Sequence, residues 1–374
     1  MADPPRLTYI TTAHFPAPKA STVQVMQMCA AFAEAGALVK LVARSEQSSD
    51  EVFAHYGLPP TFILQGRPLP RLPRASDIFQ ARAVFAEPGA DWICYTRIRE
   101  LTAPVLALAR GAKAGVELHG KPATLRERIL LRWIARHPRG RLMVISEPLK
   151  EMYWREYGLA THLAPDAVDL KRFTPPQAAA LARKQLDLDD GPWVVYVGGL
   201  YEGRGLETLF AAVAGLPVKV LVVGGRNADD VAVWQAKAVA AGASSVRFEG
   251  YQPPARVPLY LFAADVLVMP YGKKILTGSG EDITAWTSPL KLYEYAAAGR
   301  PIVSTDVMAV RPVLRHEANA LLAEPESVDS LRAALKRVID DPALAQRLAA
   351  NARQTVEGKT WTARAKQILE IILT

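Results

Sequence analysis

The chain has 374 residues, half of them hydrophobic and 22% charged, a composition that excludes an intrinsically disordered protein. No apolar run approaches the roughly 18 residues of a membrane-spanning helix, and the first residues lack the pattern of a secretion signal. The net charge is +8, and residues 1–172 carry 23 Lys and Arg against 16 Asp and Glu, so we expect an anionic partner for this half.

Only two cysteines occur, Cys29 and Cys94, and both stand in apolar surroundings. Such residues are usually buried, reduced thiols rather than members of a disulfide framework. Together with the N-terminal pattern, this predicts a cytoplasmic protein.

Short apolar runs alternate with helical patterns along the first half of the chain. Strands are expected at Leu7–Thr11, Leu38–Ala43, Trp92–Tyr95, Gly115–Leu118 and Leu142–Ile145, and a helix at Val23–Ala35. Because strands that alternate with helices form parallel sheets, residues 1–172 are expected to form one Rossmann-like α/β domain.

A turn-rich segment at 161–177 precedes a second series of the same kind. Its expected strands are Trp193–Val197, Val218–Val223, Ser245–Phe248, Val266–Met269 and Pro301–Ser304. Residues 173–357 are therefore expected to form a second doubly wound domain, which faces the first across a cleft. The last segment, 358–374, has helical periodicity at Trp361–Leu373, and we expect it to pack back on the first domain.

The strongest functional pattern starts at Ser288 and follows the strand Val266–Met269. Ser288 is a suitable N-cap, and Pro289 suits the first position of a helix that Gly299 ends. The free N–H groups of such a helix start can bind a phosphate. Lys291 supports a diphosphate, and Glu294 lies one turn deeper, where it can accept hydrogen bonds from ribose hydroxyls. The alternative is an ordinary amphipathic helix with a solvated Lys–Glu pair.

A glycine-rich turn follows the first strand of the second domain. It runs from Gly198 to Gly205 and carries Arg204, a combination that suits close approach to a diphosphate. Gly224, after the next strand, stands in a similar but weaker turn. The alternative is a tight strand-to-helix turn with a solvated arginine.

These segments, in this order, resemble the family-4 retaining glycosyltransferases of the GT-B fold, in a variant with an S-P-x-K-x-x-E-Y helix. The resemblance implies two Rossmann-like domains, a nucleoside-diphosphate sugar as donor, and no metal or other cofactor. Two positions depart from the family pattern: Gly199 replaces an arginine, and Trp286 replaces an acidic residue. Glu281 and Asp282 are the nearby carboxylates, at a spacing that does not match.

By this resemblance, His119, Arg204 and Lys291 are the expected catalytic residues. His119 ends a strand, beside the transferred sugar. Lys19, Ser21 and Arg97 are expected at the acceptor or the diphosphate. The expected donor-binding residues are Gly198, Gly199, Arg204, Gly224, Tyr251, Asp282, Ser288, Pro289, Leu290, Lys291 and Glu294.

Basic residues concentrate between Lys121 and Arg141, which holds seven Lys and Arg against one acid, Glu127. In a helix here, an apolar face of Leu125, Ile129, Leu130, Trp133 and Ile134 lies opposite Arg126, Arg128, Arg132 and Arg136. A basic helix with a tryptophan suits an anionic membrane at the inner face of the plasma membrane. The alternative is a helix packed by its apolar face.

We expect transfer of a sugar to a hydroxyl of a glycan or lipid-linked acceptor, in surface-polysaccharide or glycolipid synthesis. The alternatives are a GT-B nucleotide-sugar epimerase and a nucleotide-sugar binding protein with weak catalysis. Nucleic acid is not an expected partner, because no binding module or interleaved aromatic pattern is present.

Overall fold

A computed structural model of the chain describes residues 3–276, 280 and 282–374. The contacts within it divide the chain into two compact units. The first unit comprises Met1–Asp166, Trp286–Ser288 and Trp361–Thr374, and the second comprises Ala167–Ala285 and Pro289–Thr360. The chain therefore changes unit next to Asp166, on either side of the short segment Trp286–Ser288, and at Trp361.

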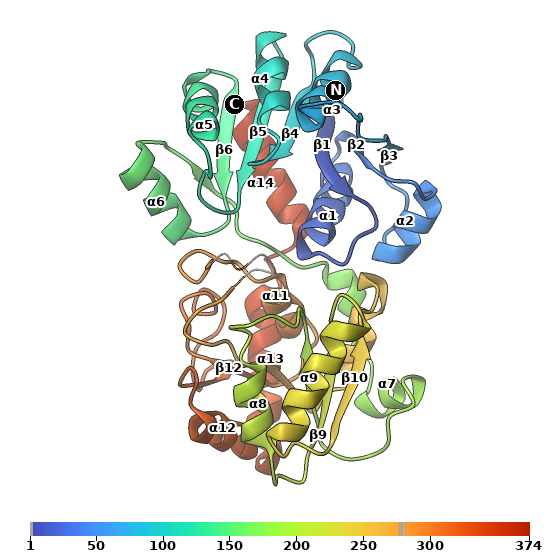
Figure 1. Cartoon of the computed structure of the whole chain (residues 1–374), viewed down its shortest axis with the longest axis vertical. Coiled ribbons are helices and arrows are strands. Elements are labelled where there is room, and N and C mark those ends of the chain that lie inside the picture. The colour runs from blue at the N-terminus through green and yellow to red at the C-terminus, as the bar shows by residue number, and fades with distance from the viewer. Residues whose placement is uncertain (1–2, 277–279, 281) are drawn as a thin grey trace. The chain divides into compact units, whose positions relative to one another are not determined.

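The first unit is a parallel sheet with helices on its faces (Figure 1). Its strands are β1 (Arg6–His14), β2 (Leu38–Arg44), β3 (Ile63–Gly66), β4 (Ile93–Arg97), β5 (Lys113–Leu118), β6 (Gly140–Val144) and β7 (His162–Leu163). Its helices are α1 (Ala20–Glu34), α2 (Ser49–Tyr56), α3 (Ala75–Phe85), α4 (Thr102–Ala109), α5 (Leu125–Arg136), α6 (Glu147–Tyr157) and α14 (Trp361–Leu373).

The strand order of this sheet is β3-β2-β1-β4-β5-β6-β7, and it reverses between β1 and β4. Leu7 of β1 is paired in register with both Val39 of β2 and Ile93 of β4. The apolar residues of β1 are buried on both faces, as a central parallel strand requires. Helix α14 packs against α1, β5 and β6, and Figure 1 shows it in red among them.

The second unit has the same plan, with the strand order β10-β9-β8-β11-β12-β13 and a reversal between β8 and β11. Its strands are β8 (Trp193–Val197), β9 (Lys219–Val223), β10 (Val246–Gly250), β11 (Val266–Met269), β12 (Ile302–Thr305) and β13 (Leu321–Ala323). Its α-helices are α7 (Ala179–Gln185), α8 (Leu206–Val213), α9 (Ala228–Ala240), α10 (Val257–Phe262), α11 (Leu290–Ala297), α12 (Val328–Asp340) and α13 (Pro342–Val356). Short 3₁₀ helices occur at Leu170–Phe173 and Pro254–Arg256.

The expected class of fold, two doubly wound α/β domains, is confirmed. Each expected strand has an observed counterpart, whereas β3, β7 and β13 were not expected from the sequence. These three strands have two to four residues and lie at sheet edges, where alternation is too short to recognise. No helix in the described part of the chain is long and apolar enough to cross a membrane.

Candidate active site

The glycine turn after β8 lies at the carboxyl edge of the second sheet. The amide of Gly198 donates to the carbonyl of Val223 at the end of β9, at 2.9 Å. A Cβ atom on Gly198 would fall 2.6 Å from Nζ of Lys291, so any other residue there would displace the amine from its observed position. Gly205, at the start of α8, has φ +73°, a backbone conformation that glycine adopts without strain. The fold thus brings the two sequence patterns of this domain together.

Two cations meet over the ring of Tyr271, which follows β11. Nζ of Lys291 lies 5.1 Å from the centre of this ring, and the guanidinium carbon of Arg204 lies 5.5 Å from it. Lys291 also lies 4.1 Å from the ring centre of Tyr196. The ring faces are electron-rich and partly compensate the positive charges. Among the described residues, Nζ of Lys291 and Nε of Arg204 are buried without a hydrogen-bond partner.

The environment of Lys291 is unfavourable for its charged form. Burial lowers the pKa of its amine well below the usual lysine range, and the charge of Arg204 lowers it further. An anionic ligand would favour the charged form of this amine beside Arg204, and ligands of doubly wound sheets bind at the reversal point where both residues lie. The arrangement therefore fits a site for a phosphate or diphosphate.

The expected helix start differs in detail from the observed one. Helix α11 begins at Leu290, Pro289 occupies the N-cap position with ψ 120°, and no side chain caps the helix. Ser288 was expected to be the cap, but its side chain forms a hydrogen bond with the buried carboxyl of Asp166 instead. The expectation that Ser288 caps the helix is therefore wrong, because this bond takes its hydroxyl away from the backbone. Gly299 follows the helix at φ +64°, as expected.

Glu294 lies one turn after Lys291 on α11. Its carboxylate forms an ion pair with Arg172 at 3.6 Å, and burial raises its pKa. The long separation leaves the carboxylate able to accept hydrogen bonds from a ligand. The position suits the predicted contact with ribose hydroxyls.

The other predicted donor residues lie at different places in the second unit. The amide of Gly224 donates to the carbonyl of Gly250 at 2.8 Å, so Gly224 and Tyr251 lie at neighbouring strand ends. The carbonyl of Gly199 accepts from the hydroxyl of Tyr196 at 2.8 Å. Asp282 accepts from both the amide and the hydroxyl of Thr284, and none of its hydrogen bonds or ion pairs in the described part of the chain joins it to Lys291. Glu281 lies outside the described residues.

In the first unit, a buried carboxylate connects several elements at the carboxyl end of β5. Glu117 has no exposed surface, and Arg364 of α14 approaches its Oε2 atom to 3.1 Å. The hydroxyl of Tyr95 donates to the same oxygen at 2.7 Å, and Gln24 donates to Oε1. Arg364 and these hydrogen bonds outweigh the cost of burial and hold the pKa of Glu117 well below its usual range.

His119 is joined to this network. Its Nε2 atom lies 2.6 Å from Oε1 of Glu117, and burial, followed by the charge of Arg97, lowers the pKa of His119 to about 4. The imidazole is therefore neutral near pH 7. A neutral ring held by a carboxylate has a fixed tautomer and orientation, which suits a hydrogen bond to a substrate hydroxyl.

The three predicted residues of the acceptor or diphosphate loop lie around α1 and β4. Arg97 donates to the carbonyl of Ser21 at 3.3 Å, so these two are brought together. Lys19 is exposed at the N-cap position of α1. The nearby carboxylate of Glu100 is buried and accepts three hydrogen bonds from Thr11 and Thr12 at 3.1–3.2 Å.

Trp286, which stands where the resembled family has an acid, is held in the first unit. Its carbonyl accepts from the hydroxyl of Ser146 at 2.8 Å, and Nζ of Lys121 lies 5.6 Å from its ring centre. Two residues later, Ser288 contacts Asp166, whose pKa burial raises to about 7. Trp286 and Ser288 thus anchor the segment that precedes α11.

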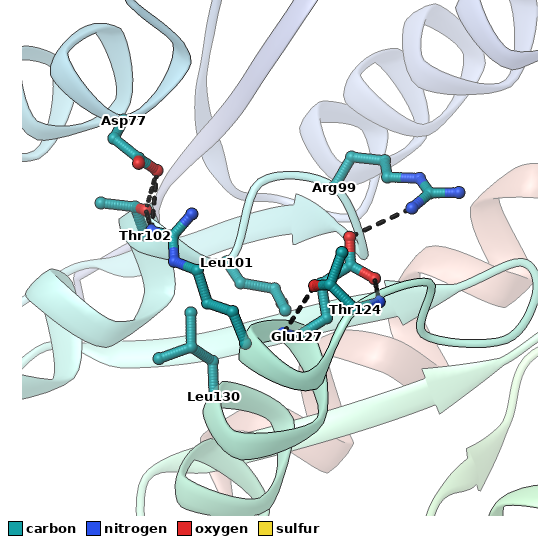
Figure 2. Close-up of a pocket in the computed structure, with 8 residues that line it drawn as sticks. Asp77, Arg99, Leu101, Thr102, Thr124, Glu127 and Leu130 are labelled. Atoms are coloured by element: carbon teal, nitrogen blue, oxygen red, sulfur yellow. Dashed lines mark hydrogen bonds and ion pairs between the residues drawn. The ribbon is translucent and has the colours of Figure 1, made fainter. Parts of the chain in front are cut away.

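A hollow of about 260 Å³ lies beside the loops that follow β4 and β5. Its lining consists of Asp77, Arg99, Leu101, Thr102, Thr124, Arg126, Glu127 and Leu130. Figure 2 shows Arg99 directed at Glu127 and Thr102 directed at Asp77. Paired charges and hydroxyls of this kind suit a polyhydroxylated ligand, because they offer donors and acceptors without a net charge.

No group of three or more His, Cys, Asp or Glu side chains is arranged to hold a metal ion within the described part of the chain. The expectation of metal-independent chemistry stays a prediction.

Four of the residues at these sites were not predicted from the sequence: Arg364, Glu100, Tyr271 and Arg172. Glu117 falls within the expected strand Gly115–Leu118 and was not expected to have a role at the site. An ionisable residue within an otherwise apolar strand, as in Val116-Glu117-Leu118, was a usable signal, because a buried charge needs a partner. The identity of that partner, some 250 residues away, depends on the fold.

Comparison with known proteins supports a glycosyltransferase. Residues 191–341 match the family described as Glycosyl transferases group 1. The chain is 28% identical over 239 residues to a D-inositol 3-phosphate glycosyltransferase of Rhodococcus erythropolis, which covers 60% of this chain and 50% of that protein. It is 30% identical over 192 residues to the lipopolysaccharide core biosynthesis glycosyltransferase LpsE of Rhizobium meliloti. That alignment covers 49% of this chain and 50% of LpsE. The alignments span about half the length of these curated relatives.

Solved structures extend the likeness to almost the whole chain. The sucrose-phosphate synthase of Thermosynechococcus elongatus superposes with a TM-score of 0.72 at 23% identity, covering 98% of each chain. HepE of Anabaena, in complex with UDP and glucose, superposes with a TM-score of 0.75 at 15% identity, again covering 98% of each chain. These likenesses show that the fold is GT-B. The activities named for these relatives favour sugar transfer over the two alternatives, a nucleotide-sugar epimerase and a nucleotide-sugar binding protein.

The carboxylate of Glu117 is expected to stabilise the first unit through Arg364. Glu117→Gln leaves the guanidinium of Arg364 buried without its counter-charge, and should lower the free energy of unfolding by about 3–5 kcal/mol. Urea unfolding measures this loss. The exposed pair of Glu156 and Lys121 provides a control, since Glu156→Gln should cost about 0–1 kcal/mol. Equal losses in the two variants would contradict the role of Glu117.

Proposed function

We propose that the chain is a retaining, metal-independent glycosyltransferase that moves a sugar from a nucleoside-diphosphate sugar to a hydroxyl acceptor. The observation that supports this best is the pair of cations over Tyr271, because Lys291 and Arg204 lack a counter-anion among the described residues. A diphosphate supplies that anion. The family match over residues 191–341 covers the same part of the chain.

In the proposed reaction, the bond between the sugar C1 and the diphosphate oxygen breaks while the acceptor oxygen bonds to C1. The electron pair leaves with the diphosphate, and the acceptor's proton passes to a phosphate oxygen. Lys291 and Arg204 stabilise the negative charge that develops on the leaving group. Because both groups are fixed before the reaction, little reorganisation is needed when the charge appears.

No metal is included in the proposed reaction, because Lys291 and Arg204 can supply the positive charge that a metal ion would provide. A leaving diphosphate needs positive charge beside it, and Lys291 and Arg204 are placed to supply it. The proposed retention of configuration rests on the resemblance to family-4 enzymes. Glu294 is proposed to accept hydrogen bonds from the ribose, and Nδ1 of His119 to accept one from a hydroxyl of the transferred sugar, since Nε2–H donates to Glu117.

The acceptor is proposed to be a glycolipid or a surface polysaccharide in the cytoplasm. Named relatives act in this chemistry, among them a phosphatidylinositol monomannoside mannosyltransferase of Mycobacterium tuberculosis, 25% identical over 245 residues. The hollow lined by Arg99 and Glu127 is a candidate for the acceptor's sugar, because it offers paired donors and acceptors.

Nucleotide binding is expected to depend on Glu294. In a thermal-shift series, one of UDP, GDP, dTDP and ADP should stabilise the protein most, by about 2.7 kcal/mol at a hundredfold excess over its Kd. Glu294→Ala should weaken this binding by about tenfold or more, since a charge-assisted hydrogen bond contributes about 1.5–3 kcal/mol. Asp340→Ala, which removes an exposed carboxylate of α12, serves as the control. Unchanged affinity in folded Glu294→Ala protein would remove Glu294 from the site.

Replacement of Lys291 is expected to change the stability of the protein and its affinity for a diphosphate in opposite directions. Lys291→Met removes a buried, unpartnered amine, and should raise the free energy of unfolding of the ligand-free protein by roughly 1 kcal/mol while it weakens diphosphate binding.

Because a bound diphosphate raises the depressed pKa of Lys291, binding should take up a proton, and affinity should fall as the pH rises through the free-site pKa. Calorimetry in two buffers of different ionisation enthalpy measures the uptake. Undiminished uptake in Lys291→Met would assign the proton to another group.

Transfer itself is expected to proceed in a chelator and to retain the anomeric configuration. Nuclear magnetic resonance of the first product formed, with an acceptor panel that includes inositol phosphates and lipid-linked sugars, measures the configuration. An inverted product would contradict retention, and loss of transfer on chelation would contradict metal independence. Nucleotide-sugar binding without transfer or hydrolysis across the panel would instead support the binding-protein alternative.

A further inference from the structure

Helix α5 carries two apolar stripes, and the core of the first unit uses only one of them. Leu131 and Ile134 have no exposed surface and pack into the core. Leu125, Ile129 and Trp133 are 71%, 58% and 42% exposed and recur every four residues, so they form a separate outward stripe. The helical pattern groups these three with Leu130 and Ile134 on one apolar face, and the structure divides that face, because Ile134 is buried while Leu125, Ile129 and Trp133 are exposed.

The outward stripe is bordered by positive charge. Arg126, Arg128, Arg132 and Arg136 are all exposed on α5. Arg126 pairs with Asp77, and Arg128 stacks on the ring of Tyr157. Arg132 and Arg136 have no hydrogen-bond or ion-pair partner in the part of the chain that the structure describes.

The one acidic residue of α5 does not offset this charge at the surface. The carboxylate of Glu127 accepts from the backbone amides of Ala123 and Thr124 in the capping box, and pairs with Arg99 at 3.1 Å. Its side chain is only 16% exposed. The outward surface of α5 therefore combines apolar side chains with unbalanced arginines.

We propose that this surface, formed by Leu125, Ile129, Trp133 and the four arginines of α5, docks on an anionic lipid bilayer. A bilayer surface offers both an apolar layer for the stripe and negative headgroups for the arginines. Tryptophan favours the boundary between these layers, because its ring is apolar and its N–H is polar. The proposal concerns binding alone and does not depend on the proposed sugar transfer.

Two other occupants fit the surface less well. In a symmetric dimer across α5, each copy would place its arginines against those of the other, and the like charges would repel. Nucleic acid would neutralise the arginines but would leave the aliphatic stripe of Leu125 and Ile129 without a partner. Charge complementarity together with the exposed apolar residues therefore favours the bilayer.

Co-sedimentation with vesicles tests the proposal on the full chain. The protein should bind vesicles of phosphatidylcholine with about a third phosphatidylglycerol at low salt, and binding should weaken strongly in about 1 M salt. Pure phosphatidylcholine should bind it far less. The double variant Arg132→Ser/Arg136→Ser should reduce the partition coefficient about thirtyfold, since each arginine near the surface contributes about fivefold and the two factors multiply.

Matched variants on other helices test whether vesicle binding depends on α5 in particular. Lys336→Ser/Arg337→Ser on α12 removes the same two charges and should leave binding within about twofold. Val233→Ser/Val239→Ser on α9 removes exposed apolar groups, and should also leave binding unchanged, whereas Leu125→Ser/Ile129→Ser should reduce it. Thermal unfolding of each variant checks that it is folded, because substitutions at exposed positions cost little stability.

The depth of Trp133 in the bilayer can be measured independently of the amount of protein bound. Lipids brominated in the acyl chain should quench part of the tryptophan fluorescence of the bound protein, and Trp133→Phe should remove that quenched part while binding is retained. The proposal is overturned if anionic vesicles at low salt bind no protein, or if the α12 control loses as much binding as the α5 variant. Self-association or binding to a duplex oligonucleotide without vesicle binding would overturn it as well.

Discussion

The candidate site of the second unit is built around two cationic side chains that share one aromatic ring. Lys291 comes from α11 and Arg204 from the turn after β8, and both lie against Tyr271, which follows β11. Folding alone does not favour this arrangement, because burial and mutual repulsion disfavour the charged amine. The surrounding sheet, and the glycine at 198 that admits the amine, hold the cations in place. Such stored electrostatic cost is typical of a preorganised site for an anion.

The first unit also buries an ionised side chain, but there the charge has partners. Its buried carboxylate, Glu117, is fully compensated by Arg364, Tyr95 and Gln24, and His119 is held against it. Compensation fixes the structure around Glu117, whereas Lys291 and Arg204 of the second unit have no counter-anion among the described residues. Because Arg364 lies on α14, the network also connects the end of the chain to the central strands of this unit.

Helix α5 shows how burial separates residues that a helical pattern groups together. Hydrophobic spacing predicts a single broad face, but the sheet can cover only the part of the helix that it reaches. Leu131 and Ile134 fill that part, and Trp133 remains outside. Whether an apolar residue is core or surface is decided by its neighbours in three dimensions, and the exposed ones then indicate an interaction surface.

The sequence by itself determined the two α/β domains, the succession of their main strands along the chain, and the positions of the glycine turn after β8 and of the helix that carries Lys291. These follow from local periodicity and turn chemistry, which act over a few residues. Only the tertiary structure decided that Ser288 bonds Asp166 rather than capping α11, and that Arg364 pairs with Glu117. It also decided that Tyr271 lies under both cations. Each of these contacts joins residues far apart in the chain, and no local pattern specifies which distant partner a buried polar group will meet.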